Sequence, residues 1–394
     1  MSSPLPTQTV PTPICTPPDG AEIAGRLARV QAGMADEGLD AYVAVSPDNV
    51  YYLTNFANFV HERPFVLVVR RTDPPYFVVP TLERSHVEAR SIGRLDLVCY
   101  FEYPAPEGAR WCDRFRTLFR PGARVGVESA CPLEVFDEVP GERVRTDIVN
   151  RARMVKSHYE VGRLAHAARV ISEAHAALLD MSRPGVTMLQ IYGEISALVT
   201  RRVLRDIPGA NMLATSSAAI VLPPSISHDP HNFTGTFAAL EEGGPHVSGV
   251  MVRANGYAAE LERTFFLGSV PEPARRPFET MMEARRLAFE LLRPGAGMSE
   301  IDERVTDVLV RAGYQANLLH RTGHSFGVTG HEAPFLARGS AGVVEAGMLF
   351  SVEPGIYLPG VGGFRHSDTV LVTDRGNVSL TSAPDTLEAL TVRL

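Results

Sequence analysis

The segment from residue 320 to residue 334 reads His320-Arg-Thr-Gly-His324-Ser-Phe-Gly-Val-Thr-Gly-His331-Glu-Ala-Pro334. Two further motifs follow it. Phe350-Ser-Val-Glu353-Pro-Gly-Ile-Tyr357 places a carboxylate between an apolar strand and a Pro-Gly turn, and Gly362-Gly-Phe-Arg365-His366-Ser-Asp368-Thr-Val-Leu-Val372 leads polar residues into another strand. Polar side chains this dense beside apolar strands indicate a functional site. Within the last motif, Arg365 and Asp368 are expected to form a structural ion pair.

Upstream of these motifs, the segment Tyr257-Ala-Ala-Glu260-Leu-Glu262-Arg-Thr264 has the pattern of a strand. Because side chains on a strand alternate between its two faces, Glu260 and Glu262 share one face. Carboxylates between apolar flanks are costly unless a cation, a metal ion or a substrate compensates them. The pair His231-Asn232 adds a titratable imidazole to the region that precedes this strand.

One motif suggests a different chemistry. The segment Gly323-His-Ser325-Phe-Gly327 fits the GxSxG pattern of a nucleophile elbow. That elbow should follow a strand, whereas Leu318–Thr322 is a poor strand. The triad acid and histidine would have to come after Ser325, where only His331 and His366 remain as histidines. We therefore interpret Ser325 as a supporting residue.

An internal repeat marks the second half of the chain. Arg183–Ile191 resembles Arg293–Ile301 at a constant offset of 110 residues. Each copy predicts a helix, a Pro-Gly stop and a second helix. Since Arg-Pro-Gly is also a common stop signal after a helix, the similarity has a plainer explanation. The alternative is a pseudo-twofold domain of two helix-pair-plus-sheet halves, which would hold a cleft between them.

The N-terminal part has a different pattern. Residues 1–20 are rich in proline and predict an extended arm, because proline lacks the N–H that helices and sheet ladders need. Helices and short apolar strands then alternate, which predicts a small α/β domain over residues 21–148. After a boundary within 143–153, residues 152–394 are expected to form the second domain. The strands expected in the first domain are Ala41–Val45, Phe65–Val69, Tyr76–Pro80 and Val125–Val127.

The composition excludes several classes of protein. The chain has 394 residues, of which 45% are apolar and 21% charged, and its formal net charge is −7. Such a chain has no general attraction to nucleic acid or to an anionic membrane, and no apolar run is long enough to span a bilayer. A P-loop is excluded because the only lysine, Lys156, follows Val155 and not glycine. No secretory signal is visible, and four scattered cysteines indicate reduced thiols in a cytoplasmic protein.

The motifs from Gly249 to the C-terminus together resemble the pita-bread superfamily, which contains Xaa-Pro aminopeptidases, prolidases, methionine aminopeptidases and creatinase. The resemblance implies an α/β (α+β) fold, with a small N-terminal α/β domain followed by a pseudo-twofold pita-bread domain. Metallopeptidases of this superfamily hold two metal ions with two aspartates, a histidine and two glutamates. At the matching positions this chain has Gly249, Glu260, His324, Glu353 and Ser367. Two ligands are therefore lost, which implies that at least one metal position is empty.

The site motifs look closest to the metal-independent, creatinase-like branch of the superfamily. Leu-Glu262-Arg-Thr, Gly-His324-Ser-Phe-Gly-Val and His231-Asn232 all have counterparts there. The resemblance implies His231 as the acid/base, with Glu262, His324 and Glu353 as further catalytic residues. No cofactor is expected, and one divalent metal ion is the alternative. The residues expected to bind substrate are Glu260, His331, His366 and Arg63, the last reaching from a neighbouring subunit.

The acidic residues suggest a substrate class. Without metal, Glu260, Glu262 and Glu353 would repel one another, so some would be protonated or would bind a cation. A guanidinium or amidinium makes paired hydrogen bonds with carboxylates. The sequence thus predicts a cytoplasmic, homodimeric hydrolase that cleaves a non-peptide C–N bond in a small guanidino, amidino or cyclic amidine compound such as ectoine. The alternatives are an Xaa-Pro dipeptidase or aminopeptidase with a modified metal site, a lyase on the same scaffold and a non-catalytic pita-bread binding module.

Overall fold

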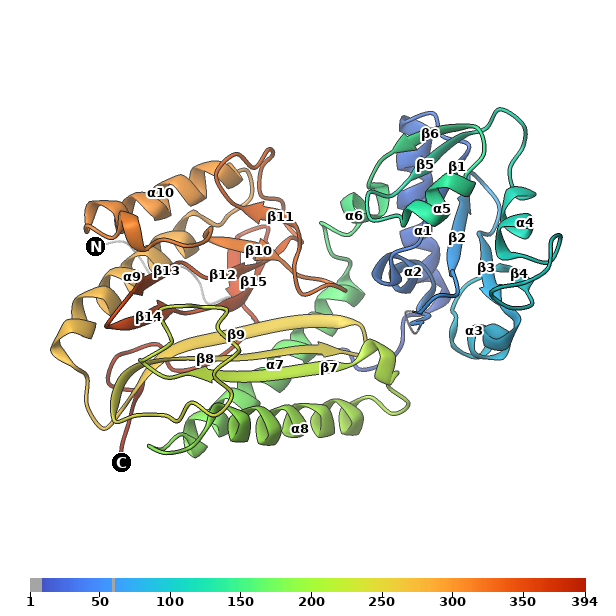
Figure 1. Cartoon of the computed structure of the whole chain (residues 1–394). Helices are drawn as coiled ribbons and strands as arrows, with labels where there is room; N and C mark the ends of the chain where they lie inside the picture. Colours follow the sequence, from blue (N-terminus) through green and yellow to red (C-terminus); the bar gives the residue numbers. More distant parts are fainter. Residues whose placement is uncertain (1–8, 59–60) are drawn as a thin grey trace. The chain divides into compact units, whose positions relative to one another are not determined.

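The computed structural model describes residues 9–58 and 61–394, and these residues divide into two compact units (Figure 1). One unit spans Thr16–Arg153. The other contains Met154–Leu394 together with the described residues that end at Cys15. The division follows Arg153, and the predicted domain bounds of 21–148 and 152–394 stay predictions. Part of the predicted proline-rich arm, residues 1–8, lies outside the described residues.

The N-terminal unit is built on one mixed sheet with the strand order β4-β3-β2-β1-β5-β6. Its two central strands β1 and β2 pair antiparallel, while β1–β5, β5–β6 and β3–β4 pair parallel. All four expected strands are present. The strands are β1 Ala41–Ala44, β2 Val66–Arg70, β3 Tyr76–Pro80, β4 Asp96–Tyr100, β5 Arg124–Val127 and β6 Glu142–Arg145. The helices are α1 Gly20–Asp36, α2 Pro47–Thr54, η1 Thr81–Glu83, α3 Arg84–Arg90, α4 Trp111–Arg116, α5 Leu133–Glu138 and α6 Ile148–Ala152.

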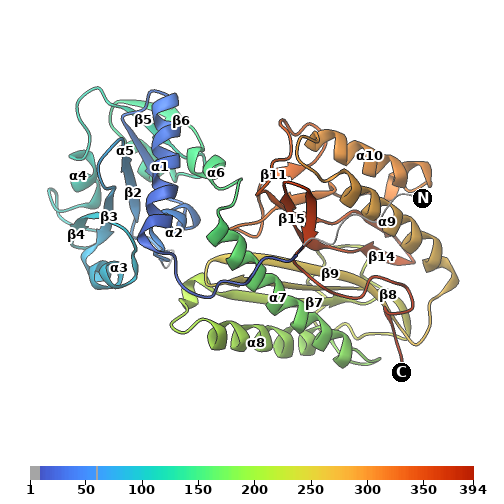
Figure 2. The ribbon, with the colours of Figure 1, turned by 180° about the vertical axis from the view of Figure 1, so that it is seen from behind.

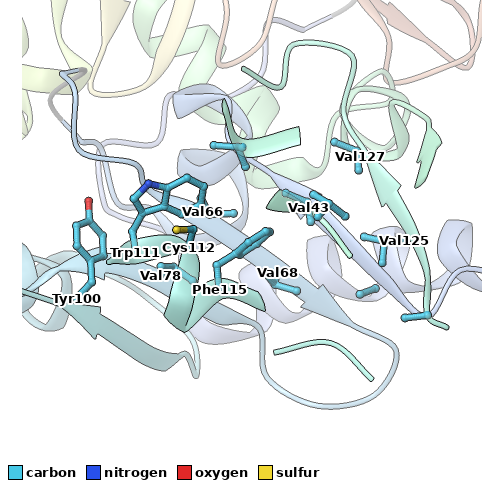
Figure 3. Close-up of a cluster of buried hydrophobic side chains, with 14 residues drawn as sticks. Val43, Val66, Val68, Val78, Tyr100, Trp111, Cys112, Phe115, Val125 and Val127 are labelled. Atoms are coloured by element: carbon cyan, nitrogen blue, oxygen red, sulfur yellow. The ribbon is translucent and has the colours of Figure 1, made fainter. Parts of the chain in front are cut away.

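One cluster of buried apolar side chains lies on one face of the sheet (Figure 3). Alternate valines of the strands, such as Val66 and Val68, point to this face because strand side chains alternate. Trp111 and Phe115 of α4 cover them, with their ring centroids 5.8 Å apart. Burial of these apolar side chains gives the N-terminal unit a hydrophobic core of its own.

The C-terminal unit contains two pairs of helices at corresponding positions of the internal repeat. The first pair is α7 His158–Met181 and α8 Met188–Asp206, and the second is α9 Glu272–Leu291 and α10 Met298–Arg311. Helix α7 begins at a capping box, in which Ser157 and Glu160 bond reciprocally to backbone N–H groups. Figure 2 shows α7 and α8 against β7 (Ser216–Leu222), β8 (Gly243–Ala254) and β9 (Tyr257–Leu267), whereas α9 and α10 contact strands within residues 332–365.

Hydrogen bonds after the first helix of each pair establish the pseudo-twofold relationship. The N–H of Gly185 donates to Leu240 O at 2.9 Å, and the N–H of Gly295 donates to Val344 O at 2.8 Å. These two glycines are separated by the repeat offset, and both have a positive φ, which favours glycine. The repeat is therefore structural, and the plainer explanation as a chance stop signal is wrong.

The strands of this unit form two larger sheets and a hairpin. The order in one sheet is β17-β9-β8-β7 and in the other β11-β10-β12-β15-β16, and β13 pairs with β14. The first sheet consists of β7 Ser216–Leu222, β8 Gly243–Ala254, β9 Tyr257–Leu267 and β17 Thr391–Val392. The other strands are β10 Gly323–Ser325, β11 Glu332–Leu336, β12 Leu349–Val352, β13 Gly355–Leu358, β14 Gly362–Arg365, β15 Asp368–Thr373 and β16 Gly376–Ser379, and the short helices are η2 Met212–Ala214 and η3 Gln315–Asn317.

This architecture confirms the predicted fold class, a small α/β domain followed by a pseudo-twofold α+β domain. Both sheets bring buried polar residues toward the centre of the C-terminal unit, where Glu262 and Ser367 bridge them through their backbones. Of the helices that the structure describes, none is both long and apolar enough to cross a membrane.

Candidate active site

A cavity of about 800 Å³ opens in the C-terminal unit, among β9, the segment after η3, the β10–β11 turn and the end of β12. It has an apolar wall that includes Ile220, Phe233 and Met251. Its polar wall carries four carboxylates, three histidines and two arginines. These residues are Asp229, Glu260, Glu262, Glu353, His231, His320, His331, Arg321 and Arg365.

Glu260 and Glu262 both line the cavity, as the alternation of strand side chains predicts. Oε1 of Glu260 accepts a hydrogen bond from Oγ of Ser367 at 2.9 Å and one from Oγ of Ser351 at 3.5 Å. The hydroxyls of the two serines are themselves 2.7 Å apart. This network of short polar side chains holds one oxygen of Glu260 in place.

Glu262 pairs with Arg365, whose Nη2 lies 2.5 Å from Oε1 of the carboxylate. Both side chains are buried, with 5% and 6% of their surfaces exposed. Burial raises the pKa of Glu262 to about 7, although Arg365 opposes that shift. The predicted pair between Arg365 and Asp368 is therefore wrong. Asp368 accepts instead from Arg263 and Arg285, because Arg365 ends β14 on the side that faces the cavity.

His324 lies behind the cavity wall, fully buried, with its ring stacked on that of His331 at 3.7 Å between centroids. Its Nδ1 lies 3.1 Å from the carbonyl oxygen of Ser325, which favours the tautomer protonated at Nδ1. Nε2 lies 3.4 Å from Oε1 of Glu353 and has no hydrogen-bond partner among the described residues. Burial lowers the pKa of His324 to about 4, so the ring is neutral near pH 7 and its lone pair is free to bind.

Glu353 follows β12, and its backbone N–H donates to the carbonyl oxygen of Thr322 at 2.8 Å. Burial, and then the charge of Glu260, raise the pKa of Glu353 well above its usual range. Three buried carboxyl groups therefore lie around one neutral imidazole and one guanidinium, and the raised pKa values of Glu262 and Glu353 show that ionising all three together is costly. A bound cation would lower this cost.

Two groups of side chains in the described residues could hold a metal ion. One is Glu260, His324 and His331, and the other is Glu260, Glu262 and Glu353; within each group the ligand atoms lie within 4.8 Å of one another. Imidazole nitrogen and carboxylate oxygen are ordinary ligands of Zn²⁺, Mn²⁺ and Co²⁺. The unpartnered Nε2 of buried His324 is a free ligand atom inside this set. The residues present therefore fit a divalent metal ion.

The structure brings together most of the residues that the sequence singled out. His231 lines the cavity and stacks on Phe233 at 6.2 Å between ring centroids. His366 does not line the cavity, although its neighbour Arg365 does. The ring of His366 is fully buried and packs edge-on against Phe278. Arg63 belongs to the N-terminal unit, where it pairs with Glu62 and Glu102.

Sequence reasoning missed two residues beside the site. Arg321 lines the cavity, and Lys156 donates from Nζ to Oγ of Ser325 at 3.0 Å and to Oε1 of Glu332 at 3.1 Å. The sequence did contain a clue to Lys156, because it is the only lysine of the chain. That fact served only to exclude a P-loop. The GxSxG segment is no nucleophile elbow, since Ser325 is buried in β10 and bonded to this lysine.

Comparisons with known proteins now add to this geometry. The model of metallopeptidase family M24 matches residues 162–374, more than half of the chain. The chain belongs to metallopeptidase family M24. The model of the creatinase/prolidase N-terminal domain matches residues 26–155. This M24 protein is therefore a hydrolase that acts on C–N bonds, on the pita-bread fold that the sequence predicted.

Relatives of this M24 protein resemble it over almost their whole length. The probable dipeptidase PepE of Mycobacterium bovis is 29% identical, with 94% of this chain and 97% of the relative covered. An Xaa-Pro dipeptidase of Lactobacillus helveticus is 27% identical, with 93% and 99% covered. The crystal structure of dipeptidase PepE from Mycobacterium ulcerans superposes with a TM-score of 0.80 at 28% identity, covering 95% of this chain and 99% of that one.

These findings correct two predictions. The creatinase-like reaction on a non-peptide C–N bond is wrong, because the relatives are dipeptidases and Xaa-Pro dipeptidases and the family is one of peptidases. The absence of a cofactor is also wrong, because the family is one of metallopeptidases and the cavity contains two groups of possible metal ligands. The loss of two carboxylates at Gly249 and Ser367 suggested an empty site, but His331 and Glu262 supply other ligand atoms nearby.

Proposed function

We propose that this protein is a metal-dependent dipeptidase whose substrates are Xaa-Pro dipeptides. The observation that carries the proposal is the buried, unpartnered Nε2 of His324, which lies behind the cavity wall, 3.4 Å from Oε1 of Glu353, in one ligand group with Glu260. The names of the relatives support the substrate class. The protein is one of the alternatives that the sequence left open, a dipeptidase with a modified metal site.

The ligands for the metal ion are Glu260, His324 and His331, one carboxylate and two imidazoles. When bound there, a divalent ion supplies Lewis-acid activation of a carbonyl oxygen and of water. The protein orients these ligands through their neighbours. Ser367 and Ser351 donate to Glu260, and the carbonyl oxygen of Ser325 fixes the tautomer of His324.

Charged side chains around the ligands can orient a dipeptide. A dipeptide carries an ammonium group at one end and a carboxylate at the other. The buried carboxylates Glu262 and Glu353 suit the ammonium group, and the guanidinium of Arg321 suits the carboxylate. A cavity that holds both carboxylates and a guanidinium would favour a small substrate that carries both charges.

Two residues suit the proton transfers of amide hydrolysis. Glu353 lies beside His324 at the cavity base and can accept the proton of the attacking water. The amide nitrogen of proline carries no hydrogen, so it must receive a proton to leave as a secondary amine. His231 lines the cavity and can donate this proton.

An apolar hollow of about 430 Å³ adjoins the cavity and shares Ile220, Phe233 and Met251 with it. Its remaining wall comes from α8 and β7, including Met188, Tyr192 and Ala218. A hollow with almost no polar surface suits the side chain of a large apolar residue. The substrate class is accordingly Xaa-Pro with a bulky apolar Xaa.

The test uses the full chain, stripped of metal with EDTA and then supplied with Mn²⁺ or Co²⁺. Release of proline from Leu-Pro, Met-Pro and Gly-Pro is followed by chromatography. We expect cleavage only with added metal, and a loss of at least about 100-fold in kcat/KM for Glu260→Gln or His324→Gln. The matched controls are Glu300→Gln and His86→Gln, whose side chains are both 67% exposed and which should keep full activity.

Cleavage that survives chelation would contradict the metal-dependent reaction. Failure to release proline from any dipeptide in the presence of metal would contradict the substrate class. The homodimer stays a prediction, as does the contact of Arg63 with a neighbouring subunit's cavity. Size-exclusion chromatography with light scattering measures the oligomeric state, and mixing Arg63→Met with Glu260→Gln chains should restore activity only if the cavity is shared.

A further inference from the structure

The two groups of possible metal ligands overlap in one residue, Glu260. The first group adds two imidazoles, His324 and His331, and the second adds two carboxylates, Glu262 and Glu353. Two ions could in principle bind side by side with Glu260 between them. The surroundings of the two groups differ, however, and this difference bears on how many ions the cavity accepts.

One carboxylate of the second group is already paired with a cationic side chain. The guanidinium of Arg365 lies 2.5 Å from Oε1 of Glu262, and both side chains are nearly inaccessible to water. Buried charges are screened weakly, so a divalent ion beside this guanidinium would be strongly repelled. Arg365 already occupies Oε1 of Glu262, which leaves Oε2 as the one oxygen of this carboxylate without a hydrogen-bond partner among the described residues. The first group includes no such cation, and it contains the unpartnered Nε2 of His324.

The backbone fixes Arg365 where it is. Its N–H donates to Oγ1 of Thr264 at 2.9 Å, and Oγ1 of Thr264 lies 3.3 Å from its carbonyl oxygen. Strand β14, which ends at Arg365, packs against β8 and β9. The backbone of Arg365 is anchored and its side chain is buried, so moving the guanidinium away from Glu262 would require the packing around it to change.

Gly249 and Ser367 make room for this pairing. Gly249 lies opposite Glu262 in the β8–β9 ladder, and a Cβ at that position would lie 3.2 Å from Oε1 of Glu262. Any side chain at residue 249 would therefore press on the carboxylate that Arg365 holds. Ser367 gives Glu260 a neutral hydroxyl donor at 2.9 Å in place of a further charge.

We propose that the cavity binds a single divalent cation, at Glu260, His324 and His331, and that the guanidinium of Arg365 pairs with Glu262 in the place where a second cation would otherwise bind. This inference rests on the proposed metal-dependent function and specifies its site. It assigns Glu262 to charge pairing and not to metal binding. The substrate's ammonium group then meets a carboxylate pair that one guanidinium partly neutralises.

The experiment counts bound ions. Metal-free protein is dialysed to equilibrium against increasing MnCl₂, and bound manganese is measured by mass spectrometry; electron paramagnetic resonance distinguishes an isolated Mn²⁺ from an exchange-coupled pair. We expect saturation at about one ion per chain, with the spectrum of an isolated ion. For Arg365→Met, which removes the charge and keeps most of the side-chain length, we expect a second ion to bind and coupling to appear.

The matched control is Arg285→Met. Arg285 is also a mostly buried arginine paired with a carboxylate, but its partner Asp368 lies outside the cavity lining. This variant should still bind one ion. Two ions per wild-type chain, or one per Arg365→Met chain, would overturn this inference while leaving the dipeptidase proposal intact. No bound Mn²⁺ at all would overturn both. The wild-type count needs no variant, so it stands even if Arg365→Met fails to fold.

Discussion

Nζ of Lys156 lies 3.1 Å from Oε1 of Glu332, and these side chains are 0% and 9% exposed. The same ammonium group donates to Oγ of Ser325 at 3.0 Å. Glu332 directly follows His331, and Ser325 directly follows His324, so one lysine contacts both segments that carry the proposed imidazole ligands. Ser325 and Glu332 are also partners in the β10–β11 ladder, next to the irregularity at His324.

We predict that Lys156→Met lowers the affinity for Mn²⁺ by about 10- to 100-fold, the usual cost of losing a group that orients metal ligands. The variant frees the two imidazoles from their common anchor and leaves the Glu332 carboxylate without its buried partner. Isothermal titration of metal-free protein with Mn²⁺ measures the affinity. Lys156→Arg keeps the charge and should recover part of the loss, whereas an unchanged affinity in Lys156→Met would refute the positioning role.

The apolar hollow predicts substrate preference. In Ala218→Phe, a large ring would occupy the hollow lined by Met188, Tyr192 and Met251. We expect kcat/KM to fall by about tenfold or more for Leu-Pro and Met-Pro, because a buried apolar side chain contributes about 1.5–3 kcal/mol. Gly-Pro, which has no side chain to place there, serves as the control on the same variant. An equal loss for all three dipeptides would argue against the hollow as a subsite.

Asp368 supports the fold beneath the site. Its carboxylate accepts from Arg263 at 2.8 Å and from Arg285 at 2.5 Å, and it is almost completely buried. Asp368→Asn leaves two guanidinium groups without their charged partner, so we predict a loss of about 3–5 kcal/mol in the free energy of unfolding. Denaturation by urea measures the change. Asp307→Asn removes a pair whose side chains are 56% and 82% exposed, and it should cost at most about 1 kcal/mol.

Buried histidines away from the metal ligands predict a dependence of stability on pH. Burial lowers the pKa of His246 to about 4 and that of His175 to about 3, from 6.5 in an unfolded chain. The folded state keeps both rings neutral, so their contribution to stability is complete above pH 6.5. Below pH 6.5 the unfolded chain takes up protons first, and the free energy of unfolding falls by about 1.4 kcal/mol per pH unit for each ring.

Urea denaturation between pH 7 and pH 4 measures this slope. His246→Gln removes one of the two titrating rings and keeps an acceptor for the N–H of Glu241, which lies 3.2 Å from Nε2 of His246. The slope of this variant should be smaller by the contribution of one ring. A slope identical to that of the wild type would show that His246 does not titrate between the folded and unfolded states as its burial implies.

Local patterns explain why much of the architecture could be predicted. The repeat with an offset of 110 residues led to two helix pairs, since periodic apolar residues and Pro-Gly stops act over a few turns of chain. The same reasoning placed Glu260 and Glu262 on one face of β9, and both line the cavity. The substrate class and the cofactor were harder to predict from the sequence. The chain lacks carboxylates at Gly249 and Ser367, and nothing local showed that His331 would come close enough to His324 to form another ligand group.

The sequence by itself determined the fold and the set of polar residues that meet at its centre, because strand alternation and helix periodicity are properties of neighbouring residues. Only the tertiary structure decided how these residues pair: Arg365 with Glu262 and not with Asp368, His366 against Phe278 and away from the cavity, Lys156 with Ser325 and Glu332. Each of these pairs joins segments far apart in the chain or turns on which face of a strand meets which neighbour. Such pairing depends on distances of a few ångströms across a packed core, and local sequence patterns do not specify these distances.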